Sequence, residues 1–169
     1  MELDLIKGLL YLKGKEGVSL KDISELLKIK EKEALTFINK LMEEDLSPFV
    51  IKKYGTLYKL AINEKYSSYY KDYFVGKEES LSKVNLEVMA IITFLGPVSV
   101  SDIDAIRGVS SRDSLNKLKR LELVDEISKE GERSSYYIIN NKGLDYFDIE
   151  DENIINDFRN KLSEKNFIN

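Results

Sequence analysis

The sequence repeats one pattern of apolar residues at an interval of 80 positions. The stretch VSLKDISELLKIKE, residues 18–31, recurs as VSVSDIDAIRGVSS, residues 98–111. Paired apolar positions continue without a gap to the end of the repeat: Val18/Val98, Leu20/Val100, Ile23/Ile103, Leu26/Ile106, Ile29/Val109, Leu35/Leu115, Ile38/Leu118 and Leu41/Leu121. A repeat carried by apolar residues predicts matching core faces, and therefore two copies of one fold in a single chain.

Each copy predicts three helices followed by a β-hairpin. Apolar residues first recur every three or four positions, as on one helix face, within 3–10 and 86–95. Ser19 and Ser99 then stand as N-cap candidates before a short second helix, because a serine oxygen accepts an N–H of the first turn. A third helix follows in each copy, and after it the apolar period changes to two, which predicts strands.

The two hairpins are predicted in residues 49–62 and 123–139. Gly55-Thr56 supplies the turn of the first hairpin and Glu130-Gly131-Glu132 that of the second. After each hairpin an asparagine, Asn63 or Asn140, is placed to cap a closing helix.

Three helices and a hairpin make the winged-helix arrangement, a variant of the helix-turn-helix. We therefore expect an α+β fold, mainly α with small β wings, containing two tandem winged-helix domains at 1–76 and 82–147. The polar, glycine-containing stretch around 77–81 is the expected linker. A tail at 148–169 carries an amphipathic segment that predicts a C-terminal helix.

The composition excludes most kinds of catalytic and metal site. The chain has no Cys and no His, which removes disulfides, thiolate catalysis, histidine acid–base chemistry and nearly every structural zinc site. Neither of the glycine-rich phosphate-binding motifs is present. We expect a protein that is not an enzyme and needs no cofactor or metal; a small hydrolase that uses carboxylates alone is a distant alternative.

The charge distribution does not favour nucleic acid as the main partner. Residues 1–77 hold 14 Lys and Arg against 12 acids, and residues 78–169 hold 12 against 18. The first third helix, 31–45, has two Lys against five acids, and the second, 110–122, is only modestly basic. Because phosphate contacts supply most of the affinity for DNA, we expect direct binding to be weak or absent. A winged-helix transcription regulator is the main alternative.

No apolar run approaches the ~20 residues that a transmembrane helix needs. The N-terminus places Glu2 and Asp4 before its apolar residues, unlike the basic start of a signal peptide. We therefore expect a cytoplasmic protein with no membrane partner.

An aromatic stripe follows the first hairpin. Tyr66, Tyr69, Tyr70, Tyr73 and Phe74 fall at helical spacing and would form one continuous face. That face either packs against its own domain or forms a partner surface, for which tyrosine is well suited. A domain of this size has limited room to bury five aromatic rings, which favours the partner surface.

The second copy alone carries Arg107-Gly108-Val109, where the first has Leu27-Lys28-Ile29. A glycine after the last helical turn predicts a left-handed C-terminal cap at Gly108. This cap does not account for the adjacent arginine.

The stretch NLEVMAIITFLGPVSVSDIDAIRGV, residues 85–109, resembles the second winged helix of segregation and condensation protein B. In that family an aliphatic helix is followed by a Pro-Val or Pro-Ile turn and an acidic helix ending in Ile-Arg-Gly-Val. LKRLELVDEI, LDYF and the opening stretch, residues 5–27, are also similar to the family. The chain departs from it at Gly96, where the family usually has Gln, and in the second wing, where only Arg133 and Tyr137 match.

The resemblance implies a non-enzymatic protein that forms a homodimer through its first winged helix and binds a kleisin subunit, ScpA-like. Through the kleisin it would join the SMC ATPase in chromosome condensation and segregation, in the cytoplasm at the nucleoid. From the apolar residues of the first helix we expect the dimer interface to include Leu3, Leu5, Leu9 and Leu12. For the kleisin we expect contacts from Tyr69, Tyr73, Ile106, Arg107 and Tyr137, with Ile106 supporting the fold beneath Arg107.

Overall fold

The computed structural model describes residues 1–73, 81–129, 131 and 134–164, and its helices and strands form two compact units. Unit 1 is Met1–Lys77 and unit 2 is Glu78–Asn169. Phe74 and the predicted linker, apart from Leu81, lie outside the described residues, as do Glu130, Glu132 and Arg133. Each unit is described by itself.

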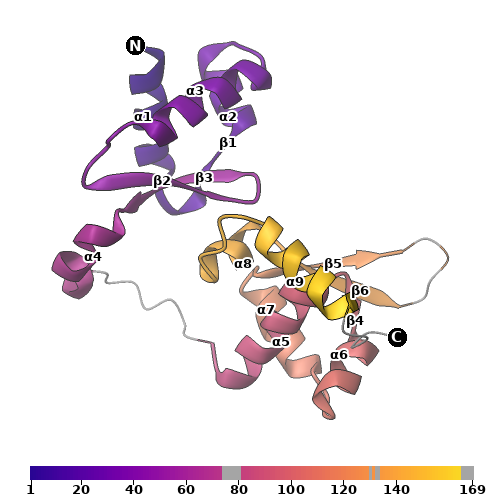
Figure 1. The fold of residues 1–169 in the computed structure, drawn as a ribbon. Coiled ribbons are helices and arrows are strands. Elements are labelled where there is room, and N and C mark those ends of the chain that lie inside the picture. Colours follow the sequence, from indigo (N-terminus) through magenta and orange to yellow (C-terminus); the bar gives the residue numbers. More distant parts are fainter. Residues whose placement is uncertain (74–80, 130, 132–133, 165–169) are drawn as a thin grey trace. The chain divides into compact units, whose positions relative to one another are not determined.

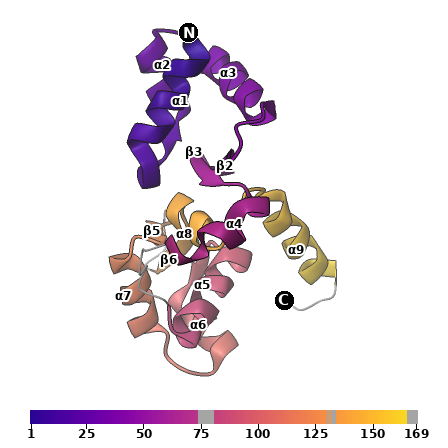
Figure 2. The ribbon, with the colours of Figure 1, turned by 90° about the vertical axis from the view of Figure 1, so that its left-hand side faces the viewer.

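The first three helices of unit 1 lie beside a three-stranded antiparallel sheet. Figures 1 and 2 show these helices grouped on one side of the hairpin. The sheet order is β1-β3-β2. In chain order the elements are α1 (Glu2–Lys13), a 3₁₀ turn η1 (Gly14–Glu16), β1 (Val18–Ser19), α2 (Leu20–Leu27), α3 (Glu31–Glu43), β2 (Phe49–Tyr54), β3 (Leu57–Ile62), α4 (Glu64–Tyr70) and a 3₁₀ turn η2 (Lys71–Tyr73).

Unit 2 repeats this arrangement and adds a helix. Its sheet order is β4-β6-β5, the same topology as in unit 1. The elements are α5 (Lys83–Leu95), β4 (Val98–Ser99), α6 (Val100–Arg107), α7 (Arg112–Arg120), β5 (Val124–Ser128), β6 (Ser135–Ile139), α8 (Asn141–Tyr146) and α9 (Asn153–Glu164). The predicted α+β fold with tandem winged helices and a C-terminal helix is confirmed.

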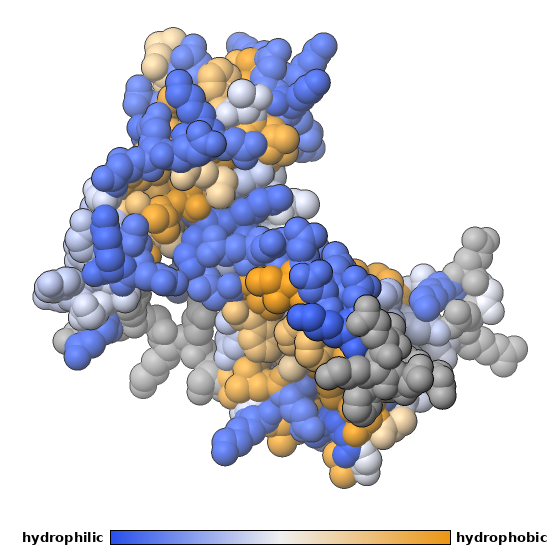
Figure 3. Space-filling view, viewed as in Figure 1, coloured by the Kyte–Doolittle hydropathy of each residue, from blue (hydrophilic) through white to orange (hydrophobic). Residues whose placement is uncertain are grey.

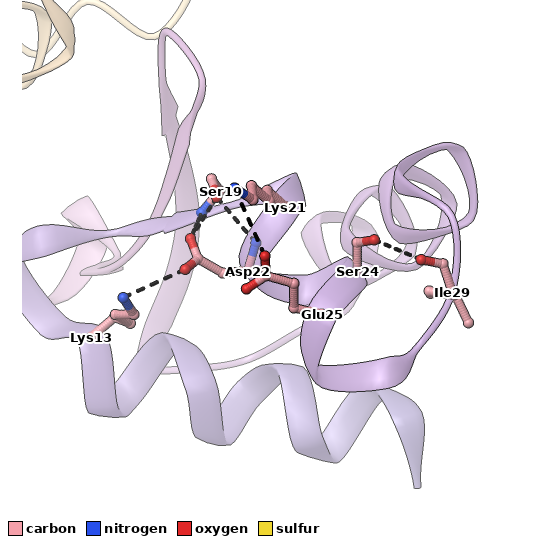
Figure 4. A network of polar contacts seen from close by, with 7 residues as sticks. All are labelled: Lys13, Ser19, Lys21, Asp22, Ser24, Glu25 and Ile29. Carbon is pink, nitrogen blue, oxygen red and sulfur yellow. Dashed lines mark hydrogen bonds and ion pairs between the residues drawn. The ribbon is translucent and has the colours of Figure 1, made fainter.

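The second helix of each unit begins at the same reciprocal cap. The Ser19 hydroxyl accepts from the Asp22 amide at 3.1 Å, and the Asp22 carboxylate accepts from the Ser19 amide at 2.8 Å (Figure 4). Ser99 and Asp102 repeat both bonds in unit 2. This arrangement, a capping box, gives partners to two backbone N–H groups that the start of a helix leaves unbonded. The predicted caps are confirmed, as are those at Asn63 and Asn140.

The repeat holds in part of the two cores: Leu26 and Ile106 are both exposed, and in the Ile29/Val109 pair only Ile29 packs against a core. Val18/Val98, Ile23/Ile103 and Ile38/Leu118 are buried in both members of each pair. The Leu35/Leu115 pair does not match, because Leu115 is buried and Leu35 is exposed. In α3 the buried stripe follows Ala34, Ile38 and Leu41, which are four and three residues apart. Leu35 is one position, about 100°, away from that stripe.

The first hairpin has the predicted turn. Strand residues pair from Phe49 with Ile62 through Tyr54 with Leu57, which leaves Gly55-Thr56 as a two-residue loop. Gly55 has a φ of 59°, in the left-handed region that glycine adopts without steric cost. In the second hairpin the strands pair from Val124 with Ile139 to Ser128 with Ser135.

Helix α9 packs against α5 within unit 2. Ile155 is buried, and the ring centroid of Phe158 lies 4.6 Å from that of Phe94. Arg159 Nε donates to the Phe94 carbonyl at 3.0 Å, near the C-terminus of α5. A cation there satisfies carbonyls that lack a helical partner and interacts favourably with the helix dipole.

Candidate binding surfaces

The aromatic segment after the first hairpin forms an open face. The Asn63 side chain caps α4 by accepting from the Lys65 amide at 3.1 Å. Tyr69 is 77% exposed and Tyr73 is 80% exposed, whereas Tyr66 is half-buried. The α-helix ends at Tyr70 and continues as a 3₁₀ turn, so the stripe is shorter and less regular than predicted.

The four leucines predicted for a dimer interface lie on two faces of α1. Leu3 and Leu9 pack against the unit 1 core, beside buried Ile6 and Leu10. Leu5 and Leu12 are exposed, Leu12 by 81%. At 100° per residue, positions 5, 8 and 12 share a side that is separate from the core stripe. Leu5 and Leu12 are therefore the members of this set that are most accessible to a partner, and the place of the four leucines in a dimer interface stays a prediction.

Arg107 is bound within unit 2. Its side chain is 5% exposed, and Nε lies 3.2 Å from Glu87 Oε2 on α5. Nη1 donates to Ser111 Oγ at 2.9 Å, across the connection between α6 and α7. Gly108 adopts the predicted left-handed cap, with φ 71°. Arg107 therefore joins α5, α6 and the start of α7.

The exposure of Ile106 and Arg107 is the reverse of what was expected, and whether either contacts a kleisin stays a prediction. Ile106 is 55% exposed, so it does not support the fold beneath its neighbour. The turn at Gly108 and the bond to Ser111 direct the arginine inward, which leaves the adjacent isoleucine on the solvent side. The two positions are only about 100° apart on the helix, and the sequence period does not separate them.

Tyr137 is a core residue. It lies on β6 and is 7% exposed, and burial raises the pKa of its hydroxyl. The expectation that it stands at the surface for a kleisin is not met by this structure. Its side chain lies on the face of the strand that packs against the helices of unit 2.

The third helices carry exposed apolar side chains and one described ion pair. On α3 the exposed side chains include Leu35 and Met42. On α7 Lys119 forms an ion pair with Glu126 of β5. Their hydrogen bond raises the pKa of Lys119 and holds that of Glu126 below its usual range. Both side chains are therefore charged at neutral pH, and they neutralise each other.

Two hollows among the described residues are lined by apolar side chains together with acidic ones. The larger, about 340 Å³, lies in unit 1 between the start of α1, the end of α2 and α3, and is lined by Glu2, Leu27, Ile29, Glu33, Thr36 and Phe37. The smaller, about 230 Å³, lies beside α9 in unit 2 and includes Ile92, Pro97 and Ile155 in its lining. Apolar side chains also reach the surface over the helices of unit 1 and around α5 and α6 (Figure 3).

The described part of the chain brings no three acidic side chains together as a metal ion would require. Among the same residues, no helix is both long and apolar enough to cross a bilayer. The described residues offer a set of exposed apolar faces on helices.

Comparison with known proteins identifies the family of this chain. Residues 4–158 match the family model of the segregation and condensation complex subunit ScpB. The chain belongs to the segregation and condensation protein B family. A relative of that name from Streptococcus agalactiae is 32% identical over 85% of this chain and 78% of its own length. Another, from Streptococcus mutans, is 30% identical over 87% of this chain and 78% of its own length.

Solved structures include family members. A dimer of the ScpB N-terminal domain complexed with a ScpA peptide is 26% identical, covers 42% of this chain and 91% of that chain, and has a TM-score of 0.39. ScpB from Mycobacterium tuberculosis is 14% identical, covers 86% of this chain and 94% of that chain, and also has a TM-score of 0.39.

Proposed function

We propose that this segregation and condensation subunit is a non-enzymatic homodimer that binds a kleisin and, through it, an SMC ATPase. Its place of action would be the cytoplasm, at the nucleoid. Family membership over residues 4–158 supports the complex. The observation that carries kleisin binding is the exposed face of α4 and η2, where Tyr69 is 77% and Tyr73 is 80% exposed. In this proposal residues 1–76 dimerise and both winged helices contact the kleisin.

Tyr69 and Tyr73 suit a docking surface for physical reasons. Each adds a large apolar area with few rotatable bonds, and each keeps a hydroxyl that remains solvated at the rim of an interface. A kleisin segment that orders on binding loses conformational entropy, and rigid aromatic anchors offset that loss best.

Calorimetry with the kleisin encoded in the same genome tests this face. Changing Tyr69 and Tyr73 together to Ala should weaken binding by ~1–3 kcal/mol for each anchor. Tyr11→Ala is a matched control, because Tyr11 is 77% exposed but lies on α1. Unchanged affinity in a folded double variant would remove Tyr69 and Tyr73 from the site.

The outward side of α1 supports the dimer. Leu5, Gly8 and Leu12 lie at i, i+3 and i+7, and a Cβ built on Gly8 meets nothing within 4 Å. A second α1 can therefore approach closely at Gly8 while the two leucines pack on either side of it.

Sedimentation of the full chain tests the dimer. Changing Leu5 and Leu12 together to Glu should yield monomers, whereas Ile154→Glu, an exposed aliphatic position on α9, should not. A parent protein that is monomeric at about tens of micromolar, the order of affinity of a modest interface, would refute the proposal.

Direct binding to DNA is proposed to be weak or absent. The exposed face of α3 carries Leu35 and Met42, and on α7 Lys119 is neutralised by Glu126. A gel-shift series at rising salt tests this. Tight binding to one duplex that survives ~150 mM salt would favour a transcription regulator instead.

A further inference from the structure

We propose that the unit 1 hollow binds a kleisin segment that presents an aliphatic or aromatic side chain beside a Lys or Arg. This inference rests on the proposed function and specifies a second contact, apart from Tyr69 and Tyr73. The volume of about 340 Å³ lies at the low end of the ~300–1,000 Å³ typical of ligand pockets. The combined volume of a few side chains of a bound peptide would fill a hollow of this size.

The walls of the hollow are apolar and held in place. Leu27, Ile29 and Phe37 are half-buried and pack against the unit 1 core. Ser24 fixes the connection that carries Ile29, because its hydroxyl donates to the Ile29 carbonyl at 2.6 Å (Figure 4). The Ile29 amide in turn donates to the Ser24 carbonyl at 3.1 Å. With both backbone groups of Ile29 bound, the wall is preorganised, which lowers the entropy cost of binding.

The rim of the hollow selects a basic partner. Both charged residues that line it are acids, Glu2 on α1 and Glu33 on α3, and both are exposed. The Glu2 carboxylate lies 3.8 Å from the N-terminal ammonium, which offsets part of its charge, so Glu33 is the main acidic group of the rim. Lys32 adjoins Glu33 in sequence but does not line the hollow. Complementary charge at a rim steers encounter and suppresses wrong partners, so the segment should place a cation beside its apolar side chain.

The second copy of the repeat is an internal comparison. At the interval of 80, Leu27 corresponds to Arg107 and Phe37 to Lys117. Leu5 and Glu87 also correspond, since each lies eight residues before the end of its helix, Lys13 or Leu95. Unit 2 therefore has the Arg107–Glu87 ion pair, with a buried arginine and an exposed glutamate, where unit 1 has two leucines. Equivalent positions on the first and second helices therefore form an ion pair in unit 2 and are apolar in unit 1.

Charge reversal at the rim tests the inference without disturbing the core. The full chain is titrated with the intact kleisin of the same genome, and separately with overlapping short peptides of it, while amide resonances are followed by NMR. Glu33→Lys should weaken binding about three- to tenfold, because it removes one exposed ion pair and adds a repulsion. Glu31→Lys is the matched control, with the same charge change two residues earlier on α3 and outside the hollow.

We expect a peptide with an apolar and a basic residue to shift the amide resonances of Leu27, Ile29 and Phe37. Of the two variants, only Glu33→Lys should weaken the binding of that peptide. If the kleisin binds but Glu33→Lys and Glu31→Lys behave alike, this inference fails and the proposed function stands. If the kleisin does not bind at all, both fail. If Glu33→Lys changes sedimentation of the protein alone, the occupant is a second copy and the inference is overturned.

Discussion

Replacing Arg107 by Ala should destabilise unit 2, and the structure gives the size of the effect. The substitution removes a guanidinium that is 5% exposed, together with its bonds to Glu87 and Ser111. A hydrogen bond to a charged group contributes ~1.5–3 kcal/mol. The Glu87 side chain is 56% exposed and water replaces its lost partner, so the Glu87 contact adds little. Ser111 is fully buried and loses a donor that water does not replace. We expect the free energy of unfolding of unit 2 to fall by about 2 kcal/mol.

Native-state hydrogen exchange in the full chain measures this loss in one unit at a time. Amides of α5 and α7 report on unit 2, and amides of α1 and α3 report on unit 1. Arg107→Ala should speed exchange in unit 2 by a factor of about 30, which corresponds to 2 kcal/mol, and leave unit 1 unchanged. Arg120→Ala is the control, because Arg120 is an exposed arginine of the same unit.

Equal exchange in Arg107→Ala and Arg120→Ala would refute this reasoning. If kleisin affinity then fell in Arg107→Ala alone, the arginine would be a partner contact, as the sequence resemblance implies. Loss of stability without loss of affinity after correction for folding would establish Arg107 as a structural residue.

Three further predictions concern the packing and the caps. Gly143→Ala should lower the free energy of unfolding of unit 2 by more than ~2 kcal/mol, because the new Cβ would lie 2.3 Å from the Leu123 carbonyl oxygen. The melting temperature of unit 2 measures this loss. The pKa of Asp22 is lowered by its hydrogen bonds to Ser19, so its stabilisation is fully present above the unfolded pKa of ~3.9 and is lost as pH falls through the lower folded value. The difference in urea midpoint between the parent and Asp22→Asn should therefore shrink below about pH 4. Arg159→Ala should speed hydrogen exchange in α9, because the helix loses its bonds to the last carbonyls of α5.

Features that depend on neighbouring residues follow from the sequence. The Ser19–Asp22 box, the two-residue loop at Gly55 and the left-handed cap at Gly108 each require only a few adjacent side chains and a local backbone geometry. The 80-residue interval likewise identifies the matching core positions, because a buried stripe fixes which helix positions are apolar. For these reasons the order of elements and the fold class are predictable from one sequence.

Which exposed side chains form a surface depends on elements distant in sequence. Ile106 and Arg107 are adjacent, and only the position of Glu87 on α5 decides that the arginine lies inside and the isoleucine outside. The sequence around Tyr137 does not show that this strand residue is buried, because the residues that cover it come from the helices of unit 2. The α1 leucines divide between core and solvent because α3 and the sheet cover one side of that helix. Periodicity marks a residue as apolar, but burial is a property of its three-dimensional neighbours, and these come only from tertiary structure.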